Sequence, residues 1–489
     1  MTHPALSAHH APPDPRRWQA LALISVAQFM LILDVTVINV ALPDIGTDLG
    51  LGRTTLTWAV TAYTLLFGGL MLLGGKLADT FGARRLMLAG LALFTLASLA
   101  TGLASNAALL IGGRAAQGVG AALLSPAALA TVTTIFHGPE RNRALGVWAA
   151  LGGAGSAVGV LLGGALTAGP GWRWVFFVNV PVGIAVLAAL PAVLRGGTAG
   201  RTAQHTTAQH TTAQHTTARR IDLPGALLVT AATGSLVYGL VSAGETGWTG
   251  AATLVPLAAA AVLYGAFALV ERAVSAPLMH PRTLTRRPVL AGAFLMLVAT
   301  GLLIGLFFVG SFYLQHLRGH SALTTGLLFL PVAIGTGVGA HVAGRLVTRL
   351  GGRPPAVLGL LLAAGGGWLL TGLTPDADVY TALLPGLVLA SAGLGAVFVS
   401  ATTTALALVP HGEAGLASGL VNTFHELGGA VGVAAISTIA AAGLAQNGVI
   451  TGFTSAFWAV TGIAGIAALL ALVLVPPGRL PELEGPHVH

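Results

Sequence analysis

The 489-residue chain contains no cysteine, and charged residues make up only 8% of it. Without cysteine there is no disulfide framework, no thiol nucleophile and no cysteine-based metal site. Soluble globular proteins are about one quarter charged, so 23 basic and 15 acidic residues are too few for the surface of a water-soluble chain of this length. The composition excludes a soluble enzyme and a disordered protein, and it favours a polytopic membrane protein.

Hydrophobic residues account for 55% of the chain, and they gather into fourteen runs of about 20 residues, the length that crosses a bilayer. We therefore predict an all-α polytopic membrane protein with 14 transmembrane helices, arranged as two six-helix bundles with two additional helices between them. The predicted segments are a cytoplasmic tail (1–17), the first bundle (18–194), a cytoplasmic linker (195–220), two additional helices (221–270), a cytoplasmic loop (271–288), the second bundle (289–475) and a cytoplasmic tail (476–489).

The basic residues predict the orientation of these helices. If both ends of the chain are cytoplasmic, nineteen of the 23 basic residues fall in cytoplasmic segments, which satisfies the positive-inside rule. Their scatter over short loops also argues against a nucleic-acid partner. The preference for arginine over lysine indicates a GC-rich bacterial genome. We therefore expect a bacterial inner-membrane protein whose N- and C-termini are cytoplasmic.

Histidines in the predicted linker suggest a metal site at first sight. Three copies of Thr-Ala-Gln-His-Thr begin at Thr202, Thr207 and Thr212. A spacing of five residues does not place the histidines on one helical face, so we interpret this segment as a flexible linker. The chain also has no P-loop, no His-Glu-x-x-His motif and no nucleotide-binding domain. These absences disfavour an enzyme and an ATP-driven pump, and we expect no metal and no cofactor.

An internal repeat relates the two predicted bundles. The segments 75–85 and 344–353 share Gly, Leu, Gly and Arg at an offset of 269 residues, and segments 118–121 and 393–396 are alike at an offset of 275. Transporters are commonly built from such repeats, with the substrate bound near the midplane between the halves.

Several motifs resemble those of the major facilitator superfamily, and specifically of its 14-helix drug:proton antiporter branch. The resemblance covers about residues 18–475 and implies a proton-driven exporter. One departure is that Gly159-Val160 stands where the fifth-helix antiporter motif has Gly-Pro. The motifs are the first-helix motif at 33–43, the loop 2–3 motif at 75–85, the fourth-helix motif at 114–120, the fifth-helix pattern at 152–164, and Trp172-Arg173-Trp174 leading to Asn179-Val180-Pro181.

Charge is scarce inside the predicted spans. Asp34 and Glu426 are the acidic residues that lie well inside one, and Arg114 is the basic residue at comparable depth. A central Asp or Arg costs about 2.5–3.5 kcal/mol on insertion scales, so each needs a partner, a water-filled cavity or protonation. A carboxylate that exchanges a proton for a cation or an arginine partner is what proton coupling requires. We therefore predict that Asp34, Glu426 and Arg114 couple transport to protons.

Polar residues near these charges are the predicted substrate-binding residues. Gln117 lies one turn from Arg114, and Asn422 lies four residues before Glu426 on the same helical face. Asp34 has a structural alternative, in which it stabilises a local kink or bonds to a neighbouring helix. The predicted substrate-binding set is Asp34, Asn39, Gln117, Asn422 and Glu426.

The predicted gating residues lie at the cytoplasmic edge and in the fifth span. Asp79 can face a helix N-terminus in the other half, where the helix dipole attracts an anion, and the family resemblance favours a gate at this loop. The alternatives are positive-inside topology alone for the loop, and plain packing for the fifth-span glycines. The predicted set is Gly75, Asp79, Gly82, Arg84, Arg85, Gly155, Gly159 and Gly163.

These observations predict a monomeric, proton-coupled antiporter that exports hydrophobic, cationic or amphipathic drugs or antibiotics by alternating access. Its partners would be a small-molecule substrate, protons and the lipid bilayer. Two alternatives stay open: an exporter dedicated to one self-made antibiotic or metabolite, and a facilitator or symporter without proton antiport. The two additional helices have no charge in their interiors, so we expect them at the periphery with no part in the site.

Overall fold

The computed structural model describes residues 16–136, 138–194, 222–274, 286–374, 377–407, 409, 414–447 and 449–478. Within these ranges the chain is helical and has no strand, as predicted. The linker at 195–220 and parts of the tails and of the 271–288 loop lie outside the described residues. The first half comprises α1 (Arg17–Leu49), α2 (Arg53–Phe81), α3 (Ala83–Gly102), α4 (Ala107–Ile135), α5 (Gly138–Ala168), α6 (Trp174–Phe177) and α7 (Asn179–Leu194).

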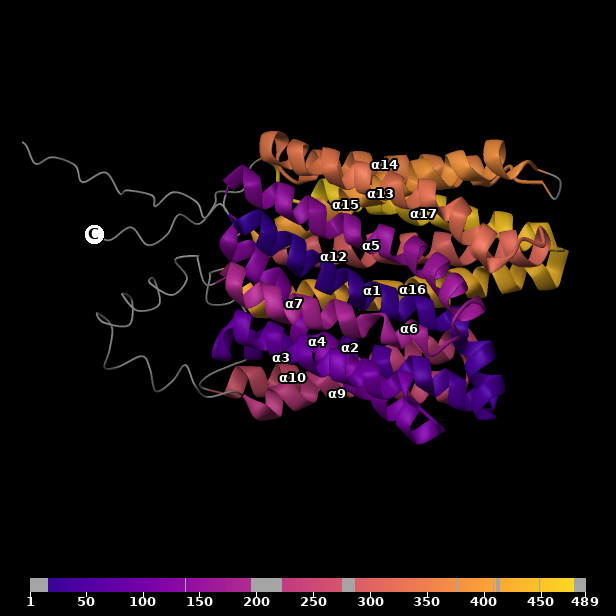
Figure 1. The fold of residues 1–489 in the computed structure, drawn as a ribbon. Helices are drawn as coiled ribbons and strands as arrows, with labels where there is room; N and C mark the ends of the chain where they lie inside the picture. The colour runs from indigo at the N-terminus through magenta and orange to yellow at the C-terminus, as the bar shows by residue number, and fades with distance from the viewer. Residues whose placement is uncertain are drawn as a thin grey trace, which may run out of the picture.

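The second half repeats this order with short π-helical turns at two of its helix ends. Its elements are α12 (Arg287–Phe312), η1 (Tyr313–Leu317), α13 (Ala322–Leu350), α14 (Arg353–Leu370), η2 (Val379–Leu383), α15 (Leu384–Leu406), α16 (Ala414–Asn447) and α17 (Val449–Leu474). Between the halves lie α9 (Leu223–Thr246) and α10 (Ala251–Ala273). All the long helices run roughly along one common direction (Figure 1).

Twelve helices in the described ranges are long and apolar enough to cross a membrane. The remaining two of the fourteen expected segments are α5 and α16, helices of 31 and 34 residues that pack among the others. An all-α membrane fold is therefore confirmed, and the count of fourteen crossings stays a prediction.

The internal repeat is visible in the backbone at two glycines. Gly82 alone separates α2 from α3 and has a φ of 93°, and Gly351, which lies 269 residues later between α13 and α14, has a φ of 82°. Residues with a Cβ rarely adopt such angles, whereas glycine does so readily. The repeated Gly therefore supplies the same tight turn in both halves.

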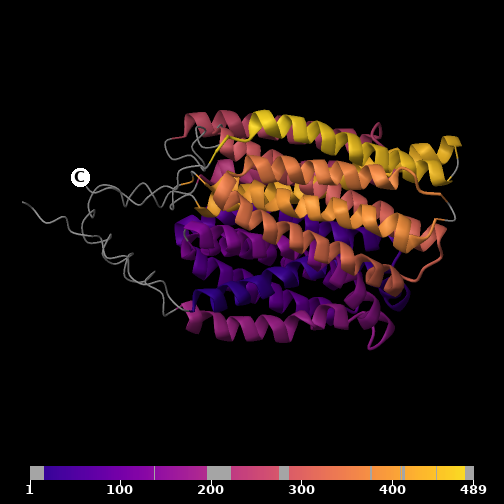
Figure 2. The ribbon, with the colours of Figure 1, turned by 90° about the horizontal axis from the view of Figure 1, so that it is seen from above.

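The two halves lie side by side (Figure 2) and meet at two interfaces. At one interface α2 packs against α16, and at the other α13 packs against α5. In chain order α2 of the first half corresponds to α13 of the second, and α5 corresponds to α16. The α2/α16 and α5/α13 interfaces are therefore equivalent under the pseudo-symmetry of the repeat.

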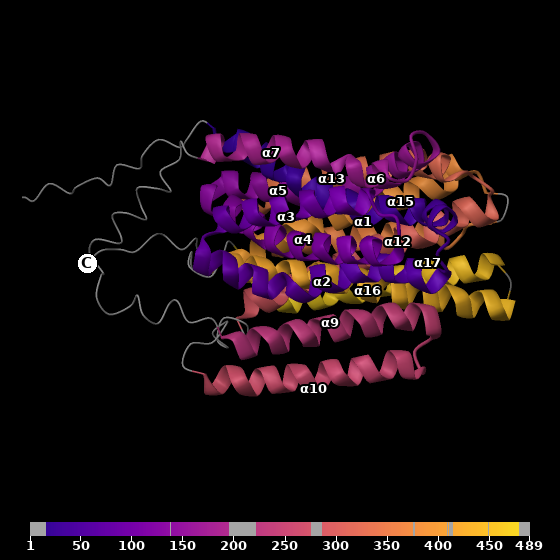
Figure 3. The same cartoon turned by 60° about the horizontal axis from the view of Figure 1, so that its bottom comes forward.

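The additional helices lie on one outer side of the molecule, next to α2 and α16 (Figure 3). In the α10 span only 11% of residues are buried, which agrees with the expected periphery. In the α9 span 56% are buried, because α9 packs against both α2 and α16. The two helices thus occupy different environments, and only α10 is peripheral throughout.

Candidate functional site

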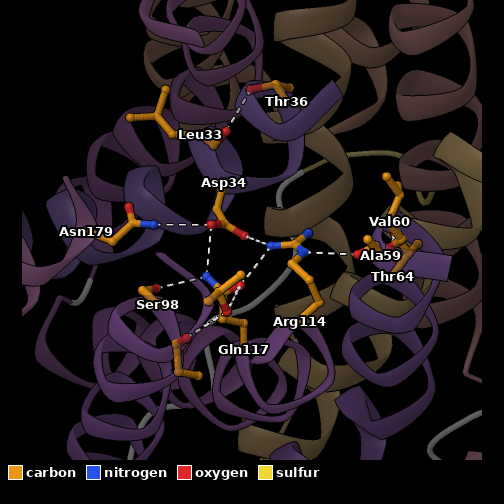
Figure 4. A network of polar contacts seen from close by, with 12 residues as sticks. Leu33, Asp34, Thr36, Ala59, Val60, Thr64, Ser98, Arg114, Gln117 and Asn179 are labelled. Carbon is orange, nitrogen blue, oxygen red and sulfur yellow. Dashed lines mark hydrogen bonds and ion pairs between the residues drawn. The ribbon is translucent and has the colours of Figure 1, made fainter. Parts of the chain in front are cut away.

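Asp34 and Arg114 form an ion pair in the interior of the first half (Figure 4). Asp34 lies on α1 and Arg114 on α4, and each is only 1% exposed. Arg114 Nη1 donates to Asp34 Oδ2, and Arg114 Nε donates to the carbonyl oxygen of Ala59 on α2 at 3.1 Å. Two charges that insertion into the bilayer would penalise separately therefore neutralise each other.

Amide side chains complete the shell around the Asp34 carboxylate. Gln117 Nε2 on α4 and Asn179 Nδ2 on α7 donate to Asp34 Oδ1 at 3.0 and 3.1 Å. Gln117 Nε2 also donates to Ser98 Oγ on α3 at 2.8 Å, and its Oε1 accepts from Arg114 Nη1 at 3.0 Å. The network therefore connects five helices of the first half: α1, α2, α3, α4 and α7.

Tyr63 on α2 covers one face of the Arg114 guanidinium, which lies 4.3 Å from the centre of its ring. The Tyr63 side chain is fully buried, and its hydroxyl has no hydrogen-bond partner in the described structure. Tyr63 therefore closes one face of the Asp34–Arg114 network with an aromatic ring.

A cavity of about 660 Å³ lies between the two halves. It is lined by α1, α2, α4 and α5 on one side and by α12, η1, α13, α15 and α16 on the other. Its walls are mostly apolar, and aromatic side chains contribute much of the surface. The aromatic lining residues are Phe67, Trp148, Phe307, Phe308, Phe312, Phe329 and Phe398.

Glu426 on α16 is the only acidic residue among those that line the cavity, and no Lys or Arg lines it. No hydrogen bond or ion pair engages the Glu426 carboxylate in the described parts of the chain. Asn422, one turn before it, also faces the cavity and donates through Nδ2 to Ser125 Oγ at 3.2 Å. His425 Nδ1 lies 3.0 Å from Thr300 Oγ1. The cavity wall therefore has a polar patch with one available carboxylate.

The predicted site residues thus fall in two separate places. Glu426 and Asn422 line the cavity, whereas Asp34, Arg114 and Gln117 are not among its lining residues. The side chain of Asn39 lies outside the described part of the structure. Among the described residues, no three His, Asp or Glu side chains gather closely enough to hold a metal ion.

Sequence reasoning missed several members of both places. Asn179 was noted only as part of a motif, although its amide bonds directly to Asp34. Ser98 and Tyr63 carried no signal, because an isolated Ser or Tyr in a span is ordinary. The aromatic lining was also missed, since its members range from Phe67 to Phe398 in the chain and only the fold brings them together.

Asp79, at the end of α2, contacts the N-terminus of α16. Its two carboxylate oxygens accept from the backbone N–H groups of Gly415 and Leu416 at 2.7 and 2.8 Å. Gly75 lies in the same contact, where a Cβ would stand 2.3 Å from the Gly415 carbonyl oxygen. We call this the charged contact; that it works as a gate stays a prediction.

The equivalent position at the α5/α13 interface has an uncharged pair. Asn142 Nδ2 on α5 donates to Thr348 Oγ1 on α13 at 3.0 Å. Thr348 follows Asp79 by 269 residues, the offset of the repeat. We call this pair the neutral contact. Both contacts join the halves at the end of the bundle where α2 ends and α16 begins, and the cavity extends away from them, toward Gln315 in η1.

The other predicted gating residues have local contacts. Arg84 Nη2 donates to the carbonyl oxygen of Pro191 on α7 at 3.2 Å, and Arg85 is exposed. The glycines of α5 face α1 of the same half: a Cβ at Gly155 would lie 2.4 Å from Ile32, and one at Gly159 only 1.7 Å from Thr36. Gly163 similarly faces Val37. These three glycines bring α5 close to α1, and their conformational role stays a prediction.

A second ion pair on α1 lies in an exposed setting, beyond the membrane-spanning part of the helix. Arg173 Nη1 donates to Asp48 Oδ2 at 2.6 Å, and Trp172 Nε1 donates to the same oxygen at 3.1 Å. The hydrogen bond from Arg173, followed by that from Trp172, holds the pKa of Asp48 below its usual value. The carboxylate therefore stays ionised at neutral pH, but an exposed pair of this kind contributes little to stability.

The sequence was compared with protein-family models and with known proteins, and both comparisons found matches over most of the chain. The model of the Major Facilitator Superfamily matches residues 24–433 and, in an overlapping match, 304–487. The puromycin resistance protein of Streptomyces alboniger is 41% identical over 429 residues, which are 87% of this chain and 82% of that protein. The cephamycin export protein of Amycolatopsis lactamdurans is 39% identical over 410 residues, covering 83% and 81% of the two chains.

A mycobacterial protein and a solved structure extend the comparison. The multidrug resistance protein Stp of Mycobacterium tuberculosis is 35% identical over 410 residues, 83% of this chain and 73% of that protein. The crystal structure of the human organic anion transporter MFSD10 superposes with a TM-score of 0.62 over 94% of this chain and 100% of that one. Its sequence identity is 15%, so this likeness bears on the fold alone.

Proposed function

Because the chain belongs to the Major Facilitator Superfamily, we propose that it is a proton-coupled antiporter that exports hydrophobic, cationic or amphipathic drugs or antibiotics by alternating access. The observation that carries this proposal is the cavity between the halves, with one unengaged carboxylate, Glu426, on an otherwise uncharged wall. Its volume of about 660 Å³ suits a drug-sized molecule, since ligand pockets measure about 300–1,000 Å³.

The two interface contacts support a direction for the cycle. The charged and neutral contacts join the halves at one end, and the cavity extends toward the other end. There α5 and α13 still meet, since a Cβ at Gly326 would lie 3.3 Å from the backbone N of Leu161, and the opening lies on the α2/α16 side. With the N-terminus cytoplasmic, as the basic residues predict, this conformation faces outward. Return to the inward-facing state then requires Asp79 to leave the N-terminus of α16.

We assign different roles to the two deep carboxylates. Glu426, which faces the cavity, binds either a proton or a cationic substrate. Asp34 loses its partner Arg114 only if the network of the first half rearranges, so it suits a proton-coupling role linked to the conformational change. A membrane potential acts on the net charge moved, at about 2.3 kcal/mol per charge per 100 mV, so the protonation of Glu426 during return determines the electrical work.

The lining supports amphipathic, cationic substrates. Seven aromatic rings offer flat apolar surfaces, and an aromatic face also attracts a cation. The relatives include proteins named for resistance to puromycin and for multidrug resistance, which suits a substrate class of this kind. We further propose a monomer in a bacterial inner membrane, with no nucleic-acid partner and no enzymatic activity.

A dedicated exporter of one compound is the second candidate. It is favoured by the single carboxylate of the cavity, which fixes one position for a cationic group, and by the relative named for cephamycin export. A panel of substrates separates the two candidates, because a dedicated exporter moves protons with one compound of the panel and a multidrug exporter moves them with several.

The test uses purified protein in proteoliposomes with an imposed pH gradient, challenged with lipophilic cations and neutral antibiotics. We expect substrate-evoked proton movement in the wild type, none in Asp34→Asn, and a selective loss of cations in Glu426→Gln. Asp48→Asn removes an exposed acid outside the site and serves as the matched control. If substrate equilibrates but protons never move with any compound, a facilitator is the correct assignment.

A further inference from the structure

The back of the Glu426 site is closed by α9, one of the two additional helices. Gly68 on α2 lies between the two: a Cβ added there would stand 3.6 Å from Val237 on α9 and 3.7 Å from the Cβ of Glu426. Val237 is 1% exposed. Glu426 therefore has the cavity on one side and a short path past Gly68 to α9 on the other.

The packing of α9 spans the α2/α16 interface on its outer side. Toward α16, Val237 and Leu240 form an apolar cluster with Leu427, the residue next to Glu426. Toward α2, Gly69 allows a close crossing, where a Cβ would lie 3.4 Å from the carbonyl oxygen of Thr230 and 3.6 Å from the Cα of Gly234. The helix thus contacts both halves at the depth of Glu426.

The outer ends of these helices are joined as well. Trp58 on α2 stacks on Tyr238 of α9, with ring centroids 6.0 Å apart. Trp248, which follows α9, donates through Nε1 to Thr438 Oγ1 on α16 at 2.9 Å. These contacts keep α9 against the interface beyond the level of the site.

The α5/α13 interface, which has no additional helix beside it, shows how the α2/α16 interface would look without α9. Its outer face is open, since Ile334 and Val338 on α13 are 65% and 55% exposed, and none of the described helices covers them. No acidic residue that lines the cavity comes from this interface. The covered interface is the one that carries Glu426.

An ionised carboxylate that faces hydrocarbon is costly, whereas one that faces a water-filled cavity is tolerated. Alternating access separates the halves at their interfaces in turn, and parting of α2 from α16 would expose Glu426 to lipid if nothing lay behind them. We propose that α9 belongs to the transport site: it closes the lipid side of the Glu426 site, so that Glu426 exchanges protons and cations with the cavity alone. Val237 is the positioning residue of this wall.

This inference rests on the proposed role of Glu426, but its test does not depend on transport. Carbodiimides modify protonated carboxyl groups, and they are available in lipid-soluble (dicyclohexylcarbodiimide) and water-soluble forms. The protein in proteoliposomes is treated with either reagent, and the adduct on the Glu426 peptide is followed by mass spectrometry. The ratio of the two rates reports whether Glu426 is reached from lipid or from water.

The decisive variant is Gly69→Leu. A Cβ at Gly69 already reaches contact distance of the α9 backbone, so the further carbons of leucine have to displace α9. We expect the lipid-soluble reagent to modify Glu426 several-fold faster than in the wild type, with the rate of the water-soluble reagent unchanged. Ala231→Leu adds the same side chain on the exposed face of α9 and should leave both rates unchanged.

Two milder variants keep the test decisive if Gly69→Leu does not fold. Val237→Ala thins the wall and should raise the lipid-phase rate, and Gly68→Ala fills the path at ordinary contact distances and should lower it. Unchanged lipid-phase rates in folded variants would overturn the proposal, and so would equal rises with both reagents, because the site would then open to water as well. Retained cation transport in Glu426→Gln would instead refute the proposed role of Glu426 in transport. The labelling rates would still decide whether α9 separates Glu426 from the lipid.

Discussion

The two interfaces between the halves are equivalent by pseudo-symmetry but differ in charge and in cover. At α2/α16, the Asp79 carboxylate accepts two backbone N–H groups of a helix N-terminus, and α9 covers the outer face. At α5/α13, an amide meets a hydroxyl, and the outer face is exposed. Charge is not confined to α2/α16, because Arg141 on α5 donates to the carbonyl oxygen of Leu406 on α15 at 3.0 Å. The carboxylate at a helix N-terminus is what distinguishes α2/α16 from the Asn142–Thr348 pair, and we expect Asp79 to control the opening of that interface.

Removing the charge of the charged contact should have the largest effect. In Asp79→Asn, a neutral amide oxygen can accept one N–H group where the carboxylate accepts two, and the helix dipole no longer attracts an anion. Hydrogen bonds to charged groups contribute about 1.5–3 kcal/mol each, so we expect the closed conformation to lose at least about 1.5 kcal/mol and transport to fall roughly tenfold. Substrate flux in proteoliposomes measures the loss.

Thr348→Ala is the matched control, because it removes the equivalent side chain of the neutral contact. One neutral hydrogen bond contributes about 0.5–1.5 kcal/mol, so flux should fall by only a few-fold. Since the chain has no cysteine, spin labels on introduced cysteines can report the separation of α2 from α16 in both variants. Equal losses and equal separations in the two variants would contradict a difference between the interfaces.

The next largest effect is expected when the glycines that allow close backbone approach at the two contacts are replaced by alanine. An added Cβ at Gly75 would lie 2.3 Å from the Gly415 carbonyl oxygen, whereas one at the equivalent Gly344 would lie 3.1 Å from that of Asn142. The first distance forces the helices apart, and overpacking of this kind costs about 1–3 kcal/mol. We expect Gly75→Ala to widen the α2/α16 spin-label distance, and Gly344→Ala to widen the α5/α13 spin-label distance by less. A reversed order would show that α5/α13 is the tighter interface.

The sequence predicts those features of the molecule that a single segment determines. Bilayer thickness sets the length of each apolar run, and the cost of a buried charge draws attention to Asp34, Arg114 and Glu426. Each of these arguments needs one segment and its solvent. The expected contact of Asp79 needs more than that, because the helix N-terminus that it meets lies 336 residues later in the chain.

The partners of these groups depend on how the helices rotate and pack. Asn179 reaches Asp34 across 145 residues, and the cavity wall combines Phe67 with Phe398. Small residues such as Gly69 and Gly234 set the approach of α9 to α2, but glycines are too frequent in this chain to indicate which pairs will meet. The interior of α9 has no charge, so the sequence alone indicates only a peripheral helix.

A smaller effect is expected on stability, where the α2/α16 interface, which α9 covers, is compared with the α5/α13 interface, whose outer face is exposed. Val237 is buried between α9 and its neighbours, and Val338 on α13 is 55% exposed. In lipid there is no hydrophobic drive between helices, so Val237→Ala loses only packing. We expect a loss of about 1 kcal/mol in Val237→Ala, and no measurable loss in Val338→Ala. Thermal unfolding in lipid nanodiscs compares them, and equal stabilities would mean that α9 is loosely packed at this depth.

The smallest expected effect is a coupling free energy that shows whether α9 moves with the first half or with the second. Trp248 Nε1 donates to Thr438 Oγ1 on α16, so a double-mutant cycle with Trp248→Phe and Thr438→Val isolates this hydrogen bond. Interhelical hydrogen bonds in membrane proteins average about 0.6 kcal/mol, and we expect a coupling of that size in unfolding experiments. Such a coupling would attach the outer end of α9 to the second half, so that α9 slides over α2 when the charged contact breaks. Zero coupling here, with a measurable one between Trp58 and Tyr238, would attach α9 to the first half instead, and Glu426 would then move relative to its own cover during each cycle.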